Sequence, residues 1–244
     1  MCGRCVIFTY DEVLDIIMKI EVGVPFGFEP DWPAQRAEAY PNSAATLIIP
    51  RFDTAIGVSA AWQEAGAKAE DACHAEVSLK SEGDIESRGS LETCSGVEPI
   101  GNFEARDMFW GFEESWKPGV VFNTRIESAT KPTWRDSMEH RRCIIPVSSF
   151  FETHRDETVA SPKTGKPIKR QYEFHVPGQD VILIGATWRG DRFSMVTTEA
   201  NAYMAPIHHR MPLVIRQEEL PLWFGPEYQK LTNRSSIKLE SEPA

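Results

Sequence analysis

The pattern of apolar and polar positions in the first part of the chain predicts short strands and one helix. Residues 6–10 form a short apolar run that is typical of a buried strand. Apolar residues then recur at three- and four-residue spacing over residues 13–20, which predicts an amphipathic helix, and Asp11 stands in the position of its N-cap. Residues 45–49 and 55–62 are further strand candidates.

Strand patterns dominate the second half of the chain. The expected strands are residues 108–112, 120–126, 142–151, 171–176, 181–188 and 192–197, and the expected helices are residues 134–140, 200–204 and 217–224. These strands do not alternate regularly with helices, as the strands of a doubly wound fold would. The pattern predicts a single α+β domain over residues 1–228, with a curved, largely antiparallel sheet and flanking helices.

Two segments differ in composition from the rest of the chain. Residues 64–98 hold nine acidic and three basic residues and no sustained apolar period, so we expect an acidic, mobile insertion. Residues 229–244 are polar and are expected to form a frayed tail. Cys73, His74 and Cys94 lie in the insertion, but their spacing matches no zinc pattern, and no metal site is predicted.

The charge of the chain is unevenly distributed. Its formal net charge at pH 7 is −10, which argues against nucleic acid because phosphate binding needs positive surface. Residues 117–172, however, hold eleven basic and six acidic residues, which gives this segment a net charge of +5. A nucleic-acid surface and an ordinary solvated surface with uneven charge are both compatible with this pattern.

The chain shows no pattern for a membrane or for export. No stretch reaches the roughly eighteen apolar residues of a membrane span. The first residues also lack the apolar core of a secretory signal. We therefore expect a cytoplasmic protein whose five cysteines form no disulfide bonds.

Cys2 has the most unusual potential reactivity. After removal of Met1, it would carry a free α-amine and a thiol on adjacent carbons. The amine can condense with an aldehyde to an imine, and the thiol can then close on the same carbon to form a five-membered thiazolidine. Two alternatives remain open. Cys2 is an incidental residue on a frayed end, or it forms a C-x-x-C redox motif with Cys5, although no strand precedes it.

Three further segments carry groups suited to acid–base or phosphate chemistry. In a strand, Asn123, Arg125 and Glu127 would share one face, where an amide can orient an amine and a guanidinium can hold a phosphate. Glu152 follows two phenylalanines, and apolar surroundings perturb the proton affinity of a carboxylate. His208 lies in a His-His-Arg-Met-Pro turn and is a candidate acid or base. The structural alternatives are a solvated strand face, a buried carboxylate paired with an arginine, and a surface loop with incidental histidines.

These segments occur in the order found in one protein family. The sequence resembles the SOS-response-associated peptidase (SRAP) family, also described as abasic-site processing proteins. The motifs that carry the resemblance are Met1-Cys2-Gly3-Arg4, Trp110-Gly111, Asn123-Thr124-Arg125-Ile126-Glu127, Arg142-Cys143-Ile144-Ile145-Pro146, Phe151-Glu152, Thr197-Thr198-Glu199-Ala200-Asn201 and His208-His209-Arg210-Met211-Pro212. Each motif is short, but their combination in this order is specific.

The resemblance implies a mixed α+β fold around a barrel-like sheet and a basic groove for single-stranded DNA. It implies that Cys2 forms a thiazolidine crosslink with the ring-opened sugar of an abasic site. By position, Asn123 would hold the Cys2 amine, Glu152 would assist proton transfer, and His208 would help to open the sugar ring. The arginines assigned to DNA binding are Arg4, Arg125 and Arg210.

The chain departs from the family pattern at three places. Ser149 and Thr153 stand where the family usually has glycine and tryptophan around the glutamate. His209 stands where an acidic residue is common, and we assign the catalytic role to His208 by its spacing to Arg-Met-Pro. The acidic segment 64–98 is longer than the family pattern leads us to expect.

Three functional hypotheses follow. The leading one is a DNA-modifying enzyme of the DNA damage response that crosslinks itself to abasic sites in single-stranded DNA, with lyase activity as an option. We expect it to need no cofactor or metal and to act as a monomer in the cytoplasm, at the nucleoid and away from membranes. The second is an N-terminal-nucleophile peptidase or amidase that uses Cys2 with His208 and Asn123, with autoproteolysis as an option. The third is a non-catalytic binder of single-stranded DNA.

Overall fold

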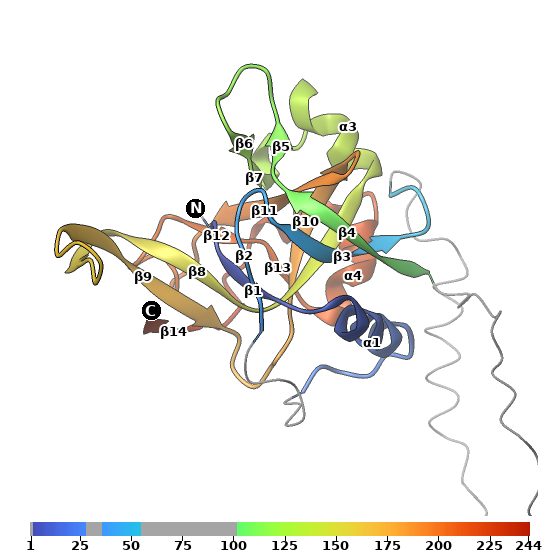
Figure 1. Ribbon diagram of the computed structural model, residues 1–244. Coiled ribbons are helices and arrows are strands. Elements are labelled where there is room, and N and C mark those ends of the chain that lie inside the picture. The colour runs from blue at the N-terminus through green and yellow to red at the C-terminus, as the bar shows by residue number, and fades with distance from the viewer. Residues whose placement is uncertain (1, 28–35, 55–101) are drawn as a thin grey trace, which may run out of the picture.

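The computed structural model describes residues 2–27, 36–54 and 102–244 (Figure 1). The strands are β1 (Cys5–Ile7), β2 (Glu38–Ala39), β3 (Ala44–Pro50), β4 (Phe103–Trp110), β5 (Phe112–Glu113), β6 (Val120–Val121), β7 (Asn123–Arg125), β8 (Arg142–Ala160), β9 (Pro167–His175), β10 (Ile182–Arg189), β11 (Arg192–Glu199), β12 (Arg210–Pro212), β13 (Val214–Ile215) and β14 (Glu240–Pro243). The α-helices are α1 (Tyr10–Glu21), α3 (Pro132–His140) and α4 (Leu220–Phe224), and the 3-10 helices are η1 (Ile126–Ser128), η2 (Gln217–Glu219) and η3 (Tyr228–Thr232).

Within the described part of the chain, one sheet of 12 strands dominates the molecule. Its main path runs β13-β10-β11-β4-β3-β8-β1-β2, and a further pairing of β10 with β8 closes β8, β10, β11, β4 and β3 into a ring. Most pairings are antiparallel, whereas β11 pairs in parallel with β4 and with β7. The predicted α+β fold, with a curved and largely antiparallel sheet and few helices, is confirmed.

The ring divides the apolar core into two clusters. Along β8, Cys143 and Ile145 belong to the first cluster and Ile144 to the second, because side chains alternate between the two faces of a strand. The first cluster draws on every strand of the ring and fills its inside. The second packs the outer face of the sheet against α1 and α4. A continuous apolar run in this strand therefore reflects burial on both faces.

Helix α1 begins two residues earlier than predicted. Its N-cap is Thr9, whose backbone N–H donates to Glu12 Oε2 (2.7 Å) and whose hydroxyl accepts from the Glu12 amide (3.4 Å). This capping box satisfies donors that the helix itself leaves unbonded, so it takes precedence over Asp11, which lies in the first turn. The predicted apolar face is confirmed, since the buried residues of α1 are Val13, Ile16, Ile17 and Ile20.

The strand predicted over residues 120–126 is divided into β6 and β7 and ends at Arg125. The chain then turns into η1, which contains Glu127. The prediction that Glu127 shares a strand face with Asn123 is therefore wrong. Its carboxylate instead binds Arg210, with both oxygens at 2.9 Å from guanidinium nitrogens, so a distant partner competes with continuation of the strand.

The helix predicted over residues 200–204 is replaced by a turn. Asn201 Oδ1 accepts hydrogen bonds from the backbone N–H groups of Tyr203 (3.1 Å) and Met204 (3.2 Å). An asparagine side chain that binds the backbone two or three residues ahead favours a turn over a helix. The apolar spacing of this segment did not reveal that competition.

The last residues do not form a frayed tail. Ile237 and Leu239 are buried in the inner core cluster, and β14 pairs antiparallel with β9. Asn201 adds to this anchoring, because its Nδ2 donates to the carbonyls of Arg234 (3.0 Å) and Ile237 (2.8 Å). The average polarity of residues 229–244 concealed three buried apolar side chains, those of Leu231, Ile237 and Leu239, which pack the segment against the core.

Several predictions fall on residues outside the described ranges. These are the strand at residues 55–62, the acidic insertion at 64–98, and the cysteines and histidine within it. Among the described helices, none is long and apolar enough to cross a membrane. Of the described cysteines, Cys2, Cys5 and Cys143 are buried and carry free thiols.

Candidate functional site

Cys2 lies beside β8, on the inner side of the ring of strands. The carbonyl of Arg4 accepts a hydrogen bond from the Phe151 amide (2.9 Å), and β1 continues the pairing with β8. Cys2 is 1% exposed and belongs to the inner core cluster, and its thiol lies 3.5 Å from the Arg4 carbonyl oxygen. The N-terminal residues are thus held along the strand that carries Glu152.

Asn123 joins β7 to Cys2. Its Nδ2 donates to the Cys2 carbonyl at 2.8 Å. The start of β7 is anchored by Phe122, whose carbonyl accepts from Trp110 Nε1 (2.8 Å) and the Met195 amide (3.1 Å). Asn123 is 8% exposed, and its Oδ1 has no hydrogen-bond partner among the described residues. This buried oxygen is available to accept a hydrogen bond from an amine at Cys2.

Glu152 and His208 form an adjoining pair. Glu152 is 2% exposed, its Oε1 accepts from the Thr153 amide (3.0 Å), and its Oε2 lies 3.7 Å from His208 Nδ1. The same nitrogen lies 3.0 Å from the Arg210 carbonyl oxygen and 3.1 Å from the Arg210 amide nitrogen, so either neutral tautomer finds a partner there. His209 is exposed, whereas His208 is the histidine that the fold brings to the glutamate.

Burial keeps the Cys2 thiol protonated at neutral pH. Burial first, and the negative charge of Glu152 second, raise the pKa of the Cys2 thiol to about 12. The reactive thiolate is therefore rare near pH 7. Because a free α-amine titrates near pH 8, an amine at Cys2 would be the first nucleophile in this site and the thiol the second.

The Arg4 side chain contacts one aromatic and two polar side chains. Its guanidinium stacks over the Phe151 ring (3.8 Å to the centroid), its Nε donates to Glu38 (2.9 Å), and its Nη1 donates to Gln171 (3.0 Å). Sequence reasoning selected Arg4 but missed these three partners. They come from three separate segments, and no local pattern links them to the N-terminus.

The other two predicted DNA-binding arginines differ in what they offer to a phosphate. Arg125 ends β7 and is exposed. Arg210 is 6% exposed, and its Nη1 and Nη2 donate to the two Glu127 oxygens. The structure therefore does not present Arg210 to a phosphate, because its ion pair already uses both terminal nitrogens.

Three side chains outside this site have ligand-type atoms within 4.8 Å of one another. They are Glu173 and His175 on β9 and Glu242 on β14. None of the four candidate site residues, Cys2, Asn123, Glu152 and His208, belongs to this group. The chemistry described above is that of an amine, a thiol, an amide, a carboxylate and an imidazole.

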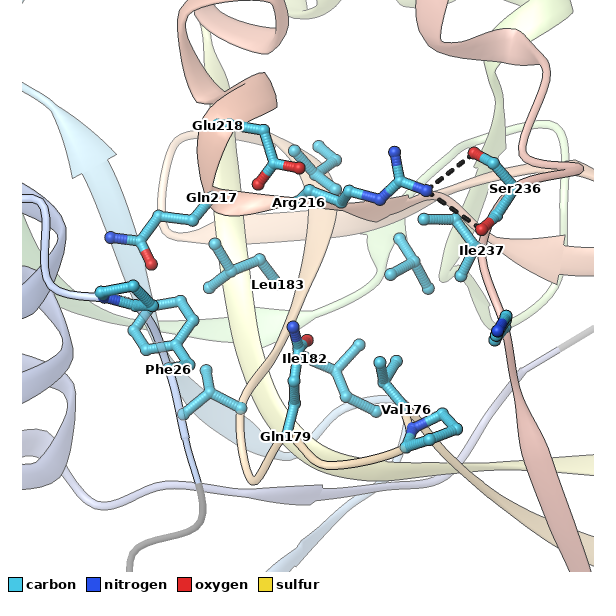
Figure 2. Close-up of a pocket in the computed structure, with 16 residues that line it drawn as sticks. Phe26, Val176, Gln179, Ile182, Leu183, Arg216, Gln217, Glu218, Ser236 and Ile237 are labelled. Atoms are coloured by element: carbon cyan, nitrogen blue, oxygen red, sulfur yellow. Dashed lines mark hydrogen bonds between the residues drawn. The ribbon is translucent and has the colours of Figure 1, made fainter.

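A pocket of about 380 Å³ opens elsewhere on the molecule (Figure 2). Its apolar floor includes Ile182 and Leu183, and Arg216 stands above them with its guanidinium hydrogen-bonded to Ser236 (2.8 and 3.0 Å). None of the four candidate site residues lines this pocket. The candidate site is thus defined by converging polar groups in the core rather than by this open cavity.

Comparisons with known proteins agree with the family resemblance of the sequence. A family model described as SOS response associated peptidase (SRAP) matches residues 1–243. The abasic site processing protein YoaM of Bacillus subtilis is 30% identical over 127 residues, which cover 48% of this chain and 55% of that protein. The abasic site processing protein YedK of Escherichia coli is 30% identical over 134 residues, which cover 49% and 54%. The chain spans about half the length of the curated relatives it matches.

Two solved structures from Bordetella bronchiseptica are similar in fold. A phage-related protein has a TM-score of 0.54 at 15% identity, with 100% of this chain and 94% of that chain covered. A second protein has a TM-score of 0.58 at 14% identity, with 100% and 99% covered. At these identities the likeness concerns the fold alone.

Proposed function

Because this chain belongs to the SOS response associated peptidase family, we propose that it acts in the DNA damage response and binds abasic sites covalently through Cys2. The relatives YoaM and YedK are named abasic site processing proteins. One observation carries the proposal. Four distant parts of the chain bring Cys2, Asn123, Glu152 and His208 into one largely buried group, in which Asn123 Nδ2 lies 2.8 Å from the Cys2 carbonyl, Glu152 lies 3.7 Å from His208, and the charge of Glu152 acts on the Cys2 thiol.

The proposed reaction starts from Cys2 with a free α-amine, after removal of Met1. The amine attacks the C1 aldehyde of the ring-opened abasic sugar, and the resulting carbinolamine loses water to give an imine. The Cys2 sulfur then adds to the imine carbon, and the thiol proton is transferred to the imine nitrogen. A thiazolidine closes, one water molecule is released, and neither an oxidant nor a reductant is consumed.

Each neighbouring side chain has a distinct part in this scheme. Asn123 Oδ1 accepts an amine N–H and thereby directs the nitrogen lone pair toward the aldehyde. Glu152 takes the proton that the attacking amine loses and returns a proton to the departing hydroxyl group. His208 donates a proton to the ring oxygen as the sugar opens. The raised pKa of the Cys2 thiol supports the order of events, because a protonated thiol does not compete with the amine.

In this proposal the DNA strand is held by two arginines, the exposed Arg125 and the partly buried Arg4. Arg4 and Arg125 bind the phosphates that flank the lesion, and Arg210 is left out because it is buried in an ion pair. Single-stranded DNA is the proposed substrate. An abasic nucleotide has no base to extrude, so the site needs only to admit the sugar.

A denaturing gel tests the proposal directly. Met1-processed protein is incubated with a single-stranded oligonucleotide that contains one abasic site, and a stable protein–DNA band is expected. The band should disappear with Cys2→Ala, with retained Met1, and with a tetrahydrofuran analogue that has no aldehyde. The absence of a band with correctly processed wild-type protein would contradict the proposal, and an adduct formed with Met1 in place would exclude a thiazolidine.

The Asn123→Ala variant tests the amine-orienting role. We expect the crosslinking rate at saturating DNA to fall about 10- to 100-fold, while the Kd for the tetrahydrofuran analogue changes less than about twofold. The rate is measured by quenched time points on denaturing gels and the Kd by fluorescence anisotropy. Equal losses in rate and affinity would contradict this role.

An N-terminal-nucleophile peptidase is the alternative enzyme, as the family description suggests. A cysteine nucleophile reacts as the thiolate, and the pKa of about 12 for the Cys2 thiol weighs against that chemistry. A peptidase would accumulate an acyl-enzyme at Cys2, which mass spectrometry detects as an added acyl mass. A non-catalytic DNA binder would instead keep its full, salt-dependent affinity for DNA in the Cys2→Ala variant and would form no covalent product.

A further inference from the structure

An ion pair between the buried Arg210 and the partly exposed Glu127 joins two halves of the candidate site. Arg210 Nη1 and Nη2 donate to Glu127 Oε1 and Oε2, each at 2.9 Å, and Nη2 also donates to the Thr197 carbonyl at 2.9 Å. Arg210 is 6% exposed. A bidentate pair between a guanidinium and a carboxylate fixes orientation as well as distance, and burial of the guanidinium reduces screening by solvent.

The carboxylate side of the pair is connected to Asn123. Helix η1, which contains Glu127, follows β7 directly, and β7 runs parallel to β11 with Asn123 opposite Met195 and Arg125 opposite Thr197. The groups that hold the Arg210 guanidinium therefore belong to β11 and to the helix that directly follows β7, and β7 places Asn123 beside Cys2. A shift of one element relative to the other would alter this half of the site.

The arginine side of the pair is connected to His208. The Arg210 amide and carbonyl lie 3.1 and 3.0 Å from His208 Nδ1, and the imidazole lies 3.7 Å from Glu152 Oε2. The main chain of Arg210 thus sets the position of the imidazole, while its side chain is tied to Glu127. Movement of the Arg210 backbone would carry His208 away from Glu152.

We propose that Glu127 and Arg210 are positioning residues, which hold the His208 imidazole against Glu152 and at a fixed distance from Asn123. This inference rests on the proposed function, because His208 serves the opening of the abasic sugar in that scheme. Arg210 acts through His208 rather than through a DNA phosphate. Lysine cannot replace it, because a single ammonium group does not engage both carboxylate oxygens in the planar geometry of a guanidinium.

Single-turnover crosslinking over a range of DNA concentrations tests this role. Arg210→Lys keeps the charge but loses the bidentate contact. It is expected to lower the maximal rate about 10-fold while the half-saturating DNA concentration changes less than about twofold. Glu127→Gln is expected to show the same pattern. The double variant should be no slower than the slower single variant, because both changes remove the same interaction.

Arg125→Gln is the matched control, because Arg125 is an exposed arginine at the end of β7, directly before the helix that contains Glu127. Loss of a phosphate contact should raise the half-saturating DNA concentration by a larger factor than it lowers the maximal rate, and it should weaken the salt dependence of that concentration. The same result for Arg210→Lys would overturn the inference. A wild-type protein that forms no crosslink would contradict the proposed function instead, so the two failures are distinguishable.

NMR of the imidazole nitrogens gives a readout without DNA. In Arg210→Lys and Glu127→Gln, the Nδ1 shift of His208 should move from its wild-type position, whereas Arg125→Gln should leave it in place. An unchanged shift in both pair variants would overturn the inference. If Arg210→Lys does not fold, Glu127→Gln carries the test, because the Glu127 side chain is 38% exposed and tolerates a change of charge more readily.

Discussion

Strand β8 carries two buried charged side chains whose surroundings differ. Arg142 opens the strand and is 1% exposed, and among the described residues its side chain donates to backbone carbonyls alone, those of Thr54, Met138, Glu139, Trp223, Phe224 and Gly225. Glu152 lies ten residues further along the chain. There the neighbouring Asn123 has a buried oxygen without a hydrogen-bond partner among the described residues, and the Cys2 thiol has a carbonyl contact of 3.5 Å.

This difference distinguishes the group around Arg142, which stabilises the fold, from the group around Glu152, which can react with a substrate. Burial lowers the pKa of Arg142 to about 10, which still leaves the guanidinium charged at neutral pH. Its hydrogen bonds clamp the end of α4 to β8, so this motif arginine supports the fold. Around Glu152, Asn123 Oδ1 and the Cys2 thiol, whose pKa is raised, remain available for a substrate. Buried polar groups that are not satisfied by the protein call for a functional explanation.

Removal of the Arg142 hydrogen bonds should have the largest effect, a loss of stability. Arg142→Met leaves six carbonyls without their donor, and we expect the free energy of unfolding to fall by about 3 kcal/mol or more. Urea denaturation measures this change, while crosslinking per folded molecule should stay near the wild-type value. Arg141→Met, next to it but paired with the exposed Asp136, should change stability by less than about 1 kcal/mol. Similar losses for the two variants would remove the distinction.

Removal of the Glu152 charge should change the reactivity of Cys2 more than the stability of the protein. Glu152→Gln eliminates the second cause of the raised pKa of the Cys2 thiol, while burial, the first cause, remains. The pKa should therefore fall below about 12, and iodoacetamide labelling of Cys2 at pH 9 should become about 3- to 10-fold faster. Mass spectrometry locates the label, and crosslinking should become slower because proton transfer is lost.

The matched control for this variant is Glu113→Gln, which changes a carboxylate that is 71% exposed. Its labelling rate at Cys2 should equal that of the wild type. If Glu152→Gln also labels at the wild-type rate, the charge of Glu152 has no influence on the thiol. The electrostatic coupling between these two residues would then be discarded.

The smallest expected effect is a decrease in the free energy of unfolding at high pH. Burial raises the pKa of the thiols of Cys2, Cys5 and Cys143 above the ordinary value of 9.0. Above pH 9 the unfolded chain loses thiol protons that the folded protein keeps, so stability falls as pH rises from 9 toward 12. At pH 10 each buried thiol should account for about 1 kcal/mol of this loss.

Urea denaturation at pH 8 and pH 10 checks this prediction. The difference in unfolding free energy between the two pH values should be about 1 kcal/mol smaller in Cys143→Ala than in the wild type. The comparison uses the difference between pH values, so the cavity left by the substitution does not affect it. An unchanged difference would show that the Cys143 thiol ionises equally in both states.

Local patterns predicted the elements well where one short-range interaction decides the structure. The strand expected over residues 181–188 is observed as Ile182–Arg189, and the buried face of α1 follows its apolar spacing. The patterns failed where a side chain binds the backbone. Thr9 and Glu12 displaced the expected cap at Asp11, and Asn201 replaced a helix with a turn. Such hydrogen bonds depend on side-chain oxygens, which apolar periodicity does not register.

The order of the motifs pointed to Cys2, Asn123, Glu152 and His208, and the fold brings all four together, although their catalytic roles remain proposals. The motifs did not distinguish arginines that face solvent from arginines that serve the core. That distinction depends on partners far away in the chain, as Glu127 is from Arg210.

The chain alone therefore determined which reactive groups are present, where strands and the first helix form, and which family the motifs resemble. Periodicity and residue chemistry are local properties, and they are readable without a fold. Tertiary structure decided which groups meet. The parallel register of β7 with β11, the path of the N-terminus along β8, and the docking of β14 are long-range choices set by packing of the core. Cys2, read first as an exposed reactive end, is a buried thiol held in its protonated form because that packing encloses it.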